Sequence, residues 1–206
     1  MNITDIVEAI LAYSDRADAA FASSGAISTF LRTVESKINR IPRIDWQTVR
    51  AYTTTDINTE YYGVPVGFNG MRDLMVRPAL DSNTRVSFDF VPPDTMNAYI
   101  NAGDHKPVYT IIGTSIHIWP KYDNYILEMI YYTQITPLTA VAPTNWLSIY
   151  YPDVYIAGAL VELFLYVKDS DSAAIWEEKF KAGISEMITE DAVDRWSGPA
   201  PAMRIA

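Results

Sequence analysis

Residues 152–167 read Pro152-Asp-Val-Tyr-Ile-Ala-Gly-Ala-Leu-Val-Glu-Leu-Phe-Leu-Tyr-Val167. Proline is well tolerated at the first position of a helix, so the stretch has a natural helix start. From Val154 onward the residues are apolar on nearly every helical face, which leaves no side suited to solvent. The stretch is shorter than the roughly 20 apolar residues needed to cross a bilayer, and Glu162 interrupts it. We therefore expect a central helix surrounded by protein.

Amphipathic helices are predicted on both sides of this core helix. Apolar residues at helical spacing indicate a helix over residues 2–13, capped by Asn2, and a second over residues 27–41. The second should end near Pro42, because a proline disfavours the helical conformation of the residue before it. A third apolar stripe, residues 176–188, predicts a helix after a polar turn.

The middle of the chain has a different character, with short segments rich in Tyr, Thr, Val and Ile that are separated by Gly, Pro, Asn and Asp. Gly113-Thr114 suits the tight turn of a hairpin, and Pro92-Pro93 suits the start of a short helix. The candidate strands cover residues 46–55, 71–77, 86–91, 109–112, 115–119 and 125–134.

Together these patterns predict an α+β fold, in which N- and C-terminal helices form a bundle and a β-rich module is inserted between them. The predicted parts are N-terminal helices (1–45), the β-rich module with its short helix (46–140), C-terminal helices (141–195) and an extended tail (196–206). The tail has too little apolar content to pack alone, so we expect it to become ordered on a partner.

Composition argues against most catalytic and cofactor chemistry. The chain of 206 residues has no Cys, which excludes disulfides, Cys-ligated metal and thiol nucleophiles. His105 and His117 are the only imidazoles and form no metal-binding pattern, and no phosphate-binding glycine loop occurs. We expect no metal and no cofactor. Residues 1–5 contain an acid where a signal peptide would carry basic residues, so no signal peptide and no membrane association are expected.

Paired carboxylates are the one catalytic arrangement that composition leaves open, since a glycan hydrolase needs only two. Glu128 lies in an otherwise apolar strand, where burial would raise the pKa of its carboxyl group. We interpret it instead as an outward-facing residue of an alternating strand. Glu162, within the core helix, is better explained as a paired or interface charge.

The charge balance argues against specific binding of nucleic acid. The net charge is −9; residues 51–150 carry five basic and nine acidic residues, and residues 151–206 carry five and ten. Such a surface suits DNA that must pass without adhering. The only basic run is expected to be a solvated helix face, or alternatively a patch for an acidic partner; it consists of Arg32, Lys37, Arg40, Arg43 and Arg50.

Several segments, in this order, resemble one known family. They are residues 5–16, 30–40, 92–96, 107–113, 143–147 and 151–155. The most distinctive portion combines Thr144-Asn-Trp-Leu147, Pro152-Asp-x-Tyr155, Ala157-Gly-Ala-Leu160, Lys168-Asp169 and Trp176-Glu177. Together these segments resemble the head-to-tail adaptor (connector) proteins of tailed bacteriophages over residues 2–190. The shared residues form a scaffold and carry no catalytic group across.

The resemblance implies a structural virion protein that is not an enzyme. Its copies would form a homo-oligomeric ring, usually of twelve, between the portal protein and the next tail or nozzle protein, with a channel for genome DNA that is not specifically bound. It would reside in the virion neck, and in the host cytoplasm before assembly. In related adaptors the C-terminal segment often reaches the portal, which makes the tail the expected partner-binding site: Trp196, Pro199, Pro201, Met203, Arg204 and the final Ile205-Ala206.

Two other functions remain open from the sequence. One is a tail-associated glycan hydrolase that uses paired carboxylates. The other is a different tail or neck component, such as a tail-tube terminator or a fibre-docking protein. For the adaptor, we further expect a net acidic channel wall.

Overall fold

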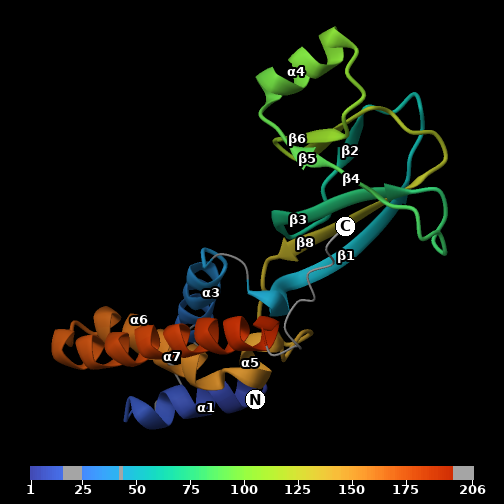
Figure 1. The fold of residues 1–206 in the computed structure, drawn as a ribbon. Coiled ribbons are helices and arrows are strands. Elements are labelled where there is room, and N and C mark those ends of the chain that lie inside the picture. The colour runs from blue at the N-terminus through green and yellow to red at the C-terminus, as the bar shows by residue number, and fades with distance from the viewer. Residues whose placement is uncertain (16–24, 42–43, 197–206) are drawn as a thin grey trace. The chain divides into compact units, whose positions relative to one another are not determined.

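The computed structural model describes residues 1–15, 25–41 and 44–196, the last three without their side chains (Figure 1). The fold is α+β, with N- and C-terminal helices on either side of a β-rich region, as predicted. The chain forms two compact units: a helical unit from Met1–Trp46 and the residues from Ile135 onward, and a β unit, Gln47–Gln134. Each unit is described separately below.

The helical unit consists of segments from both ends of the chain (Figure 1). Its helices are α1 (Ile3–Tyr13), α3 (Ala26–Ile38), α5 (Trp146–Tyr150), α6 (Pro152–Tyr166) and α7 (Ser170–Trp196). Asn2 caps α1 as predicted, because its side chain accepts a hydrogen bond of 2.9 Å from the backbone N–H of Asp5. Helix α3 ends at Ile38, a turn before the predicted end at Pro42, and Asn39 forms its C-cap.

Helix α6 is the centre of this unit, since it packs against α1, α3, α5 and α7. Its residues from Val154 to Val161 are all buried, which confirms the predicted core helix. Close packing depends on Gly158. A Cβ atom there would lie 2.8 Å from both Phe180 of α7 and Val34 of α3, so only glycine lets the three helices approach this closely.

The β unit contains two four-stranded sheets. The first has the order β1 (Thr48–Thr54), β8 (Ile126–Thr133), β3 (Phe68–Arg77), β4 (Val86–Ser87); the second has the order β2 (Tyr61–Gly63), β7 (Ser115–Trp119), β6 (Val108–Ile112), β5 (Asp89–Phe90), with helix α4 (Pro93–Ala102) after β5. Leu74, Leu127 and Met129 of the first sheet share a buried core with Ile116 and Ile118 of the second. The unit is therefore built from two sheets around one apolar core.

The predicted hairpin is confirmed: β6 and β7 pair in antiparallel register, and Gly113 occupies the turn with φ +60°. One strand prediction was wrong. The single strand over residues 86–91 is divided into β4 and β5, which belong to different sheets. The backbone N–H of Phe88 bonds to Leu74 of the first sheet, whereas that of Asp89 bonds to Pro107 beside the second, so the chain changes sheets between these residues.

Candidate functional site

The predicted partner-binding tail lies almost entirely outside the described residues. Trp196 is the last residue of α7, and its side chain is not described. Residues 197–206, which include the other predicted contact positions, are not described either. The tail assignment therefore stays a prediction.

Glu128 occupies a buried ion-pair cluster in the β unit. Its side chain is fully buried, and the expectation that it faces outward was wrong. The carboxylate oxygens lie 3.1 Å from Nε of Arg50 on β1 and 3.1 Å from Nη2 of Arg77 on β3, the strands on either side of β8. The Arg77 guanidinium also lies over the Tyr52 ring, 5.5 Å from its centroid. A polymeric glycan cannot reach this buried carboxylate. Its two ion pairs instead connect β8 to the neighbouring strands β1 and β3.

The two imidazoles do not form a metal site. The buried His117 places Nε2 3.0 Å from the Glu60 carboxylate and packs against the Tyr61 ring, 4.6 Å between centroids. His105 is exposed and lies parallel to the Trp119 ring at 6.4 Å. Within the described part of the chain, no group of three or more His, Asp or Glu residues could hold a metal ion.

A buried polar network in the helical unit was not predicted. The Glu35 carboxylate accepts a hydrogen bond of 2.9 Å from the Tyr155 hydroxyl and one of 2.7 Å from the backbone N–H of Leu138. The Asn145 side chain in turn donates to the Tyr155 oxygen, at 2.7 Å. Burial raises the pKa of Glu35, an effect that these hydrogen bonds and the nearby Arg32 only partly offset. Burial likewise raises the pKa of Tyr155.

The network connects three parts of the helical unit. It joins α3, α6 and the segment from Thr136 to Asn145 that leads into α5, because Asn145 also donates to the Thr136 carbonyl. One sequence signal was available: Glu35 falls between Leu31 and Ile38 at a position of the apolar stripe, where an acid needs a buried partner. The partner itself, 120 residues away, had no such signal.

The remaining charged candidates are engaged locally. Glu162 is paired with Lys37 of α3 at 2.7 Å, in agreement with its interpretation as a paired charge. The basic run is not one continuous patch: Arg50 belongs to the β unit and pairs with Glu128, and Arg43 is outside the described residues. Arg32 and Arg40 are exposed.

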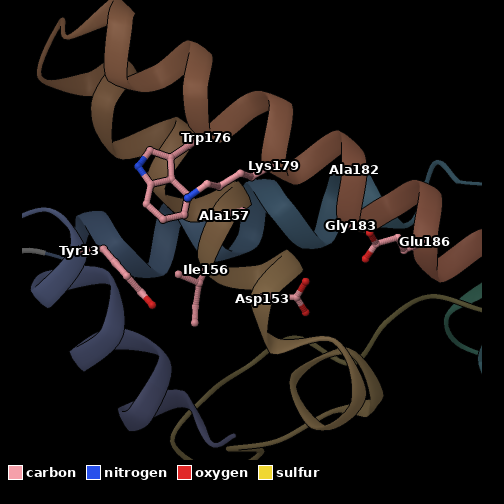
Figure 2. A pocket seen from close by; sticks show the side chains of 9 residues that line it. All are labelled: Tyr13, Asp153, Ile156, Ala157, Trp176, Lys179, Ala182, Gly183 and Glu186. Atoms are coloured by element: carbon pink, nitrogen blue, oxygen red, sulfur yellow. The ribbon is translucent and has the colours of Figure 1, made fainter.

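An open groove of about 380 Å³ lies between α1, α6 and α7 (Figure 2). Tyr13 of α1 and Trp176 of α7 meet edge to face at one end, with ring centroids 5.4 Å apart, and Asp153 and Glu186 lie toward the other end. The floor is apolar and is formed by small residues such as Ala157 and Gly183. This shape and chemistry suit a docked polypeptide segment better than a reacting small molecule.

Two exposed apolar patches lie near opposite ends of α6. The first patch, before α6, consists of Trp46, Ile149 and Tyr150, which are 43 to 53% exposed, and the Trp46 and Tyr150 rings stack at 4.2 Å. The second patch, around the turn between α6 and α7, consists of Leu165, Tyr166 and Ile175, which are 56 to 64% exposed. Exposed aromatic and aliphatic side chains grouped in this way are typical of protein interfaces.

The family model described as SU10 adaptor protein matches residues 1–203, nearly the whole chain. The chain belongs to the SU10 adaptor protein family. No curated protein matches the chain significantly.

Membership makes the chain a structural adaptor protein of a bacteriophage, a kind of protein that has no enzymatic role. An adaptor of this family interacts with other head and tail proteins and resides in the neck of the virion. Among the described residues, no helix is long and apolar enough to cross a membrane.

Proposed function

We propose that the protein is a head-to-tail adaptor whose copies form a closed ring between the portal and the next tail or nozzle protein. The genome DNA passes through the channel of this ring. The observation that carries the proposal is the match of the SU10 adaptor family model over residues 1–203. The likeness to connector proteins in the sequence points the same way and suggests twelve copies.

The distribution of exposed apolar residues supports ring formation. A closed ring requires two different surfaces on each subunit, since each copy meets its two neighbours through unlike faces. The first patch (Trp46, Ile149, Tyr150) and the second patch (Leu165, Tyr166, Ile175) provide two such surfaces. Helix α6, whose 15 residues span about 22 Å, lies between the first patch and Leu165 and Tyr166 of the second, so the two patches can contact separate neighbours.

The charge of the chain supports passage of DNA without adhesion. With a net charge of −9, the subunit has the same sign as the phosphate backbone, so there is no counterion release to favour binding. We propose a net acidic channel wall. The tail, residues 196–206, is proposed to bind the portal.

Imaging of purified particles at the neck tests the proposal directly. We expect a ring of this protein between portal and tail, with both units recognisable in each subunit. Location at the far end of the tail tube or at a fibre base would refute the proposal and favour a terminator or a fibre-docking protein. A second test is size-exclusion chromatography with and without the isolated portal ring, where co-elution with the portal is expected.

A further inference from the structure

The groove between α1, α6 and α7 results from the way the helices pack in the helical unit. Gly183 of α7 faces α6, and a Cβ atom at this position would lie 2.9 Å from the Val154 side chain. Glycine therefore brings the two helices together here, while Ala157 and Ala182 leave the space beside them unfilled. The result is an open hollow of about 380 Å³ whose floor is formed by small apolar residues.

The two ends of the groove have different chemistry. At the aromatic end, the Lys179 ammonium group lies 4.1 Å from the centroid of the Trp176 ring, so this cation already has a partner. At the other end, Asp153 and Glu186 are exposed, and within the described part of the chain neither carboxylate has an ion pair. The groove therefore fits an occupant with small apolar side chains and one cation (Figure 2).

The sequence of residues 197–206, Ser-Gly-Pro-Ala-Pro-Ala-Met-Arg-Ile-Ala, has this composition. Arg204 is its only charged side chain and lies between Met203 and Ile205, which complements an apolar floor that ends in two acids. Pro199 and Pro201 restrict their backbone φ angles, so less conformational entropy is lost when the segment becomes ordered.

The connection is also long enough. Glu186 precedes Trp196 by ten residues of continuous helix, about 15 Å. Arg204 follows Trp196 by eight residues, which span up to about 26 Å when extended. The segment can therefore turn back along α7 and bring Arg204 to Glu186. Attachment to the same chain also gives it an effective concentration on the order of millimolar at this site.

We infer that in the free subunit residues 197–206 dock in this groove of their own chain, with the Arg204 guanidinium against Asp153 and Glu186. This docking does not depend on ring formation or on the portal. A partner that captures the same segment must compete with the groove. The partner's apparent affinity for the segment is then its intrinsic affinity multiplied by the fraction of segments that are undocked.

Engineered cysteines in the full-length chain test this docking, because the natural sequence contains no Cys. In the double variant Ala182→Cys with Met203→Cys, oxidation in dilute solution is expected to give a disulfide within one chain, visible as a faster band on non-reducing gels. The control is Ser36→Cys with Met203→Cys, since Ser36 is exposed on α3 and does not line the groove. It should react roughly tenfold more slowly, because the segment is not held near it.

Charge reversal supplies the second arm. Arg204→Glu in the Ala182→Cys/Met203→Cys background should slow disulfide formation, and added Glu186→Lys should restore it. Asp153→Lys is an alternative partner reversal if the Glu186 variant does not fold. The inference is overturned if the groove pair reacts no faster than the control, if only disulfide-linked dimers form, or if charge reversal has no effect.

Discussion

The Tyr155 hydroxyl donates a hydrogen bond of 2.9 Å to a Glu35 carboxylate that is buried within the helical unit. Two further donors, the backbone N–H of Leu138 and the side chain of Asn145, complete this network. The hydrogen bonds favour the ionised carboxylate, but burial outweighs them and raises the pKa of Glu35 above its ordinary value of 4.5. The ionised form of Glu35 is therefore less favourable in the folded chain than in the unfolded chain, so the stability of the protein depends on pH.

The first prediction concerns that pH dependence. Because the pKa of Glu35 is higher in the folded than in the unfolded chain, its contribution to stability is complete below pH 4.5 and is lost as the pH rises through the folded value. Glu35→Gln removes the titration. Relative to wild type, this variant should gain stability as the pH rises above 4.5 and then level off. Urea denaturation at a series of pH values measures the difference.

Glu177→Gln is the matched control. Lys181 lowers the pKa of the exposed Glu177 carboxyl, so the difference between wild type and this variant should have the opposite sign and be small. A constant stability difference between wild type and Glu35→Gln across the pH series would contradict the prediction.

The second prediction separates the two arginines that contact Glu128. The Arg77 side chain is only 6% exposed, whereas that of Arg50 is 55% exposed. Arg77→Met leaves a buried carboxylate with one exposed partner and should cost about 3–5 kcal/mol of unfolding free energy. Arg50→Met should cost clearly less than Arg77→Met, because the exposed Arg50 guanidinium is screened by solvent. If urea denaturation gave the two variants equal losses of unfolding free energy, the difference in burial between the two arginines would not determine their contributions, and the prediction would be wrong.

The third prediction concerns the packing at Gly158. Gly158→Ala places a methyl group 2.8 Å from Phe180 and Val34, and relief of this overlap should cost about 1–3 kcal/mol. Gly63→Ala is the control, because a Cβ atom there has no neighbour within 4 Å and its φ is not positive. The control should change stability by less than about 0.5 kcal/mol. Thermal or urea unfolding of both variants checks the prediction. A Gly158→Ala variant with the same unfolding free energy as wild type would refute it.

Local patterns in the sequence were sufficient to predict the elements whose environment is uniform. The continuous apolar run of α6, the Asn2 cap and the Gly113 turn each depend on neighbours in sequence, and all three are found in the structure. Short elements were less accessible. The three-residue strand β2 and the five-residue helix α5 were missed, since neither is long enough to show a period.

Partners distant in sequence could not be predicted from local patterns. Glu128 looks like an outward-facing residue of an alternating strand until the sheet order places Arg50 and Arg77 beside it. The groove likewise requires α1, α6 and α7 together, although its residues Trp176 and Asp153 appear in the sequence only as members of ordinary helices. Such sites depend on which elements become neighbours in the fold, and the periodicity of apolar residues along the sequence does not specify those neighbours.

The last prediction concerns the two apolar patches and follows from the proposed ring. Leu165→Ser with Ile175→Ser, in the second patch, should abolish ring formation on the portal. Both side chains are more than half exposed, so the unfolding free energy should change by less than about 0.5 kcal/mol. Tyr150→Ser, in the first patch, should also abolish ring formation, with a larger loss of stability because the Tyr150 ring stacks on Trp46. Val193→Ser is the control, because Val193 is also exposed on α7 but belongs to neither patch.

Mixing the two defective subunits distinguishes the kind of contact. In a ring with unlike faces, the intact first patch of one variant can pair with the intact second patch of the other, but only once. Native mass spectrometry should therefore detect heterodimers in the mixture, and neither rings nor homodimers. If each patch instead binds its own copy on a neighbour, each variant alone would form homodimers through its intact patch. That outcome would contradict the ring with unlike faces.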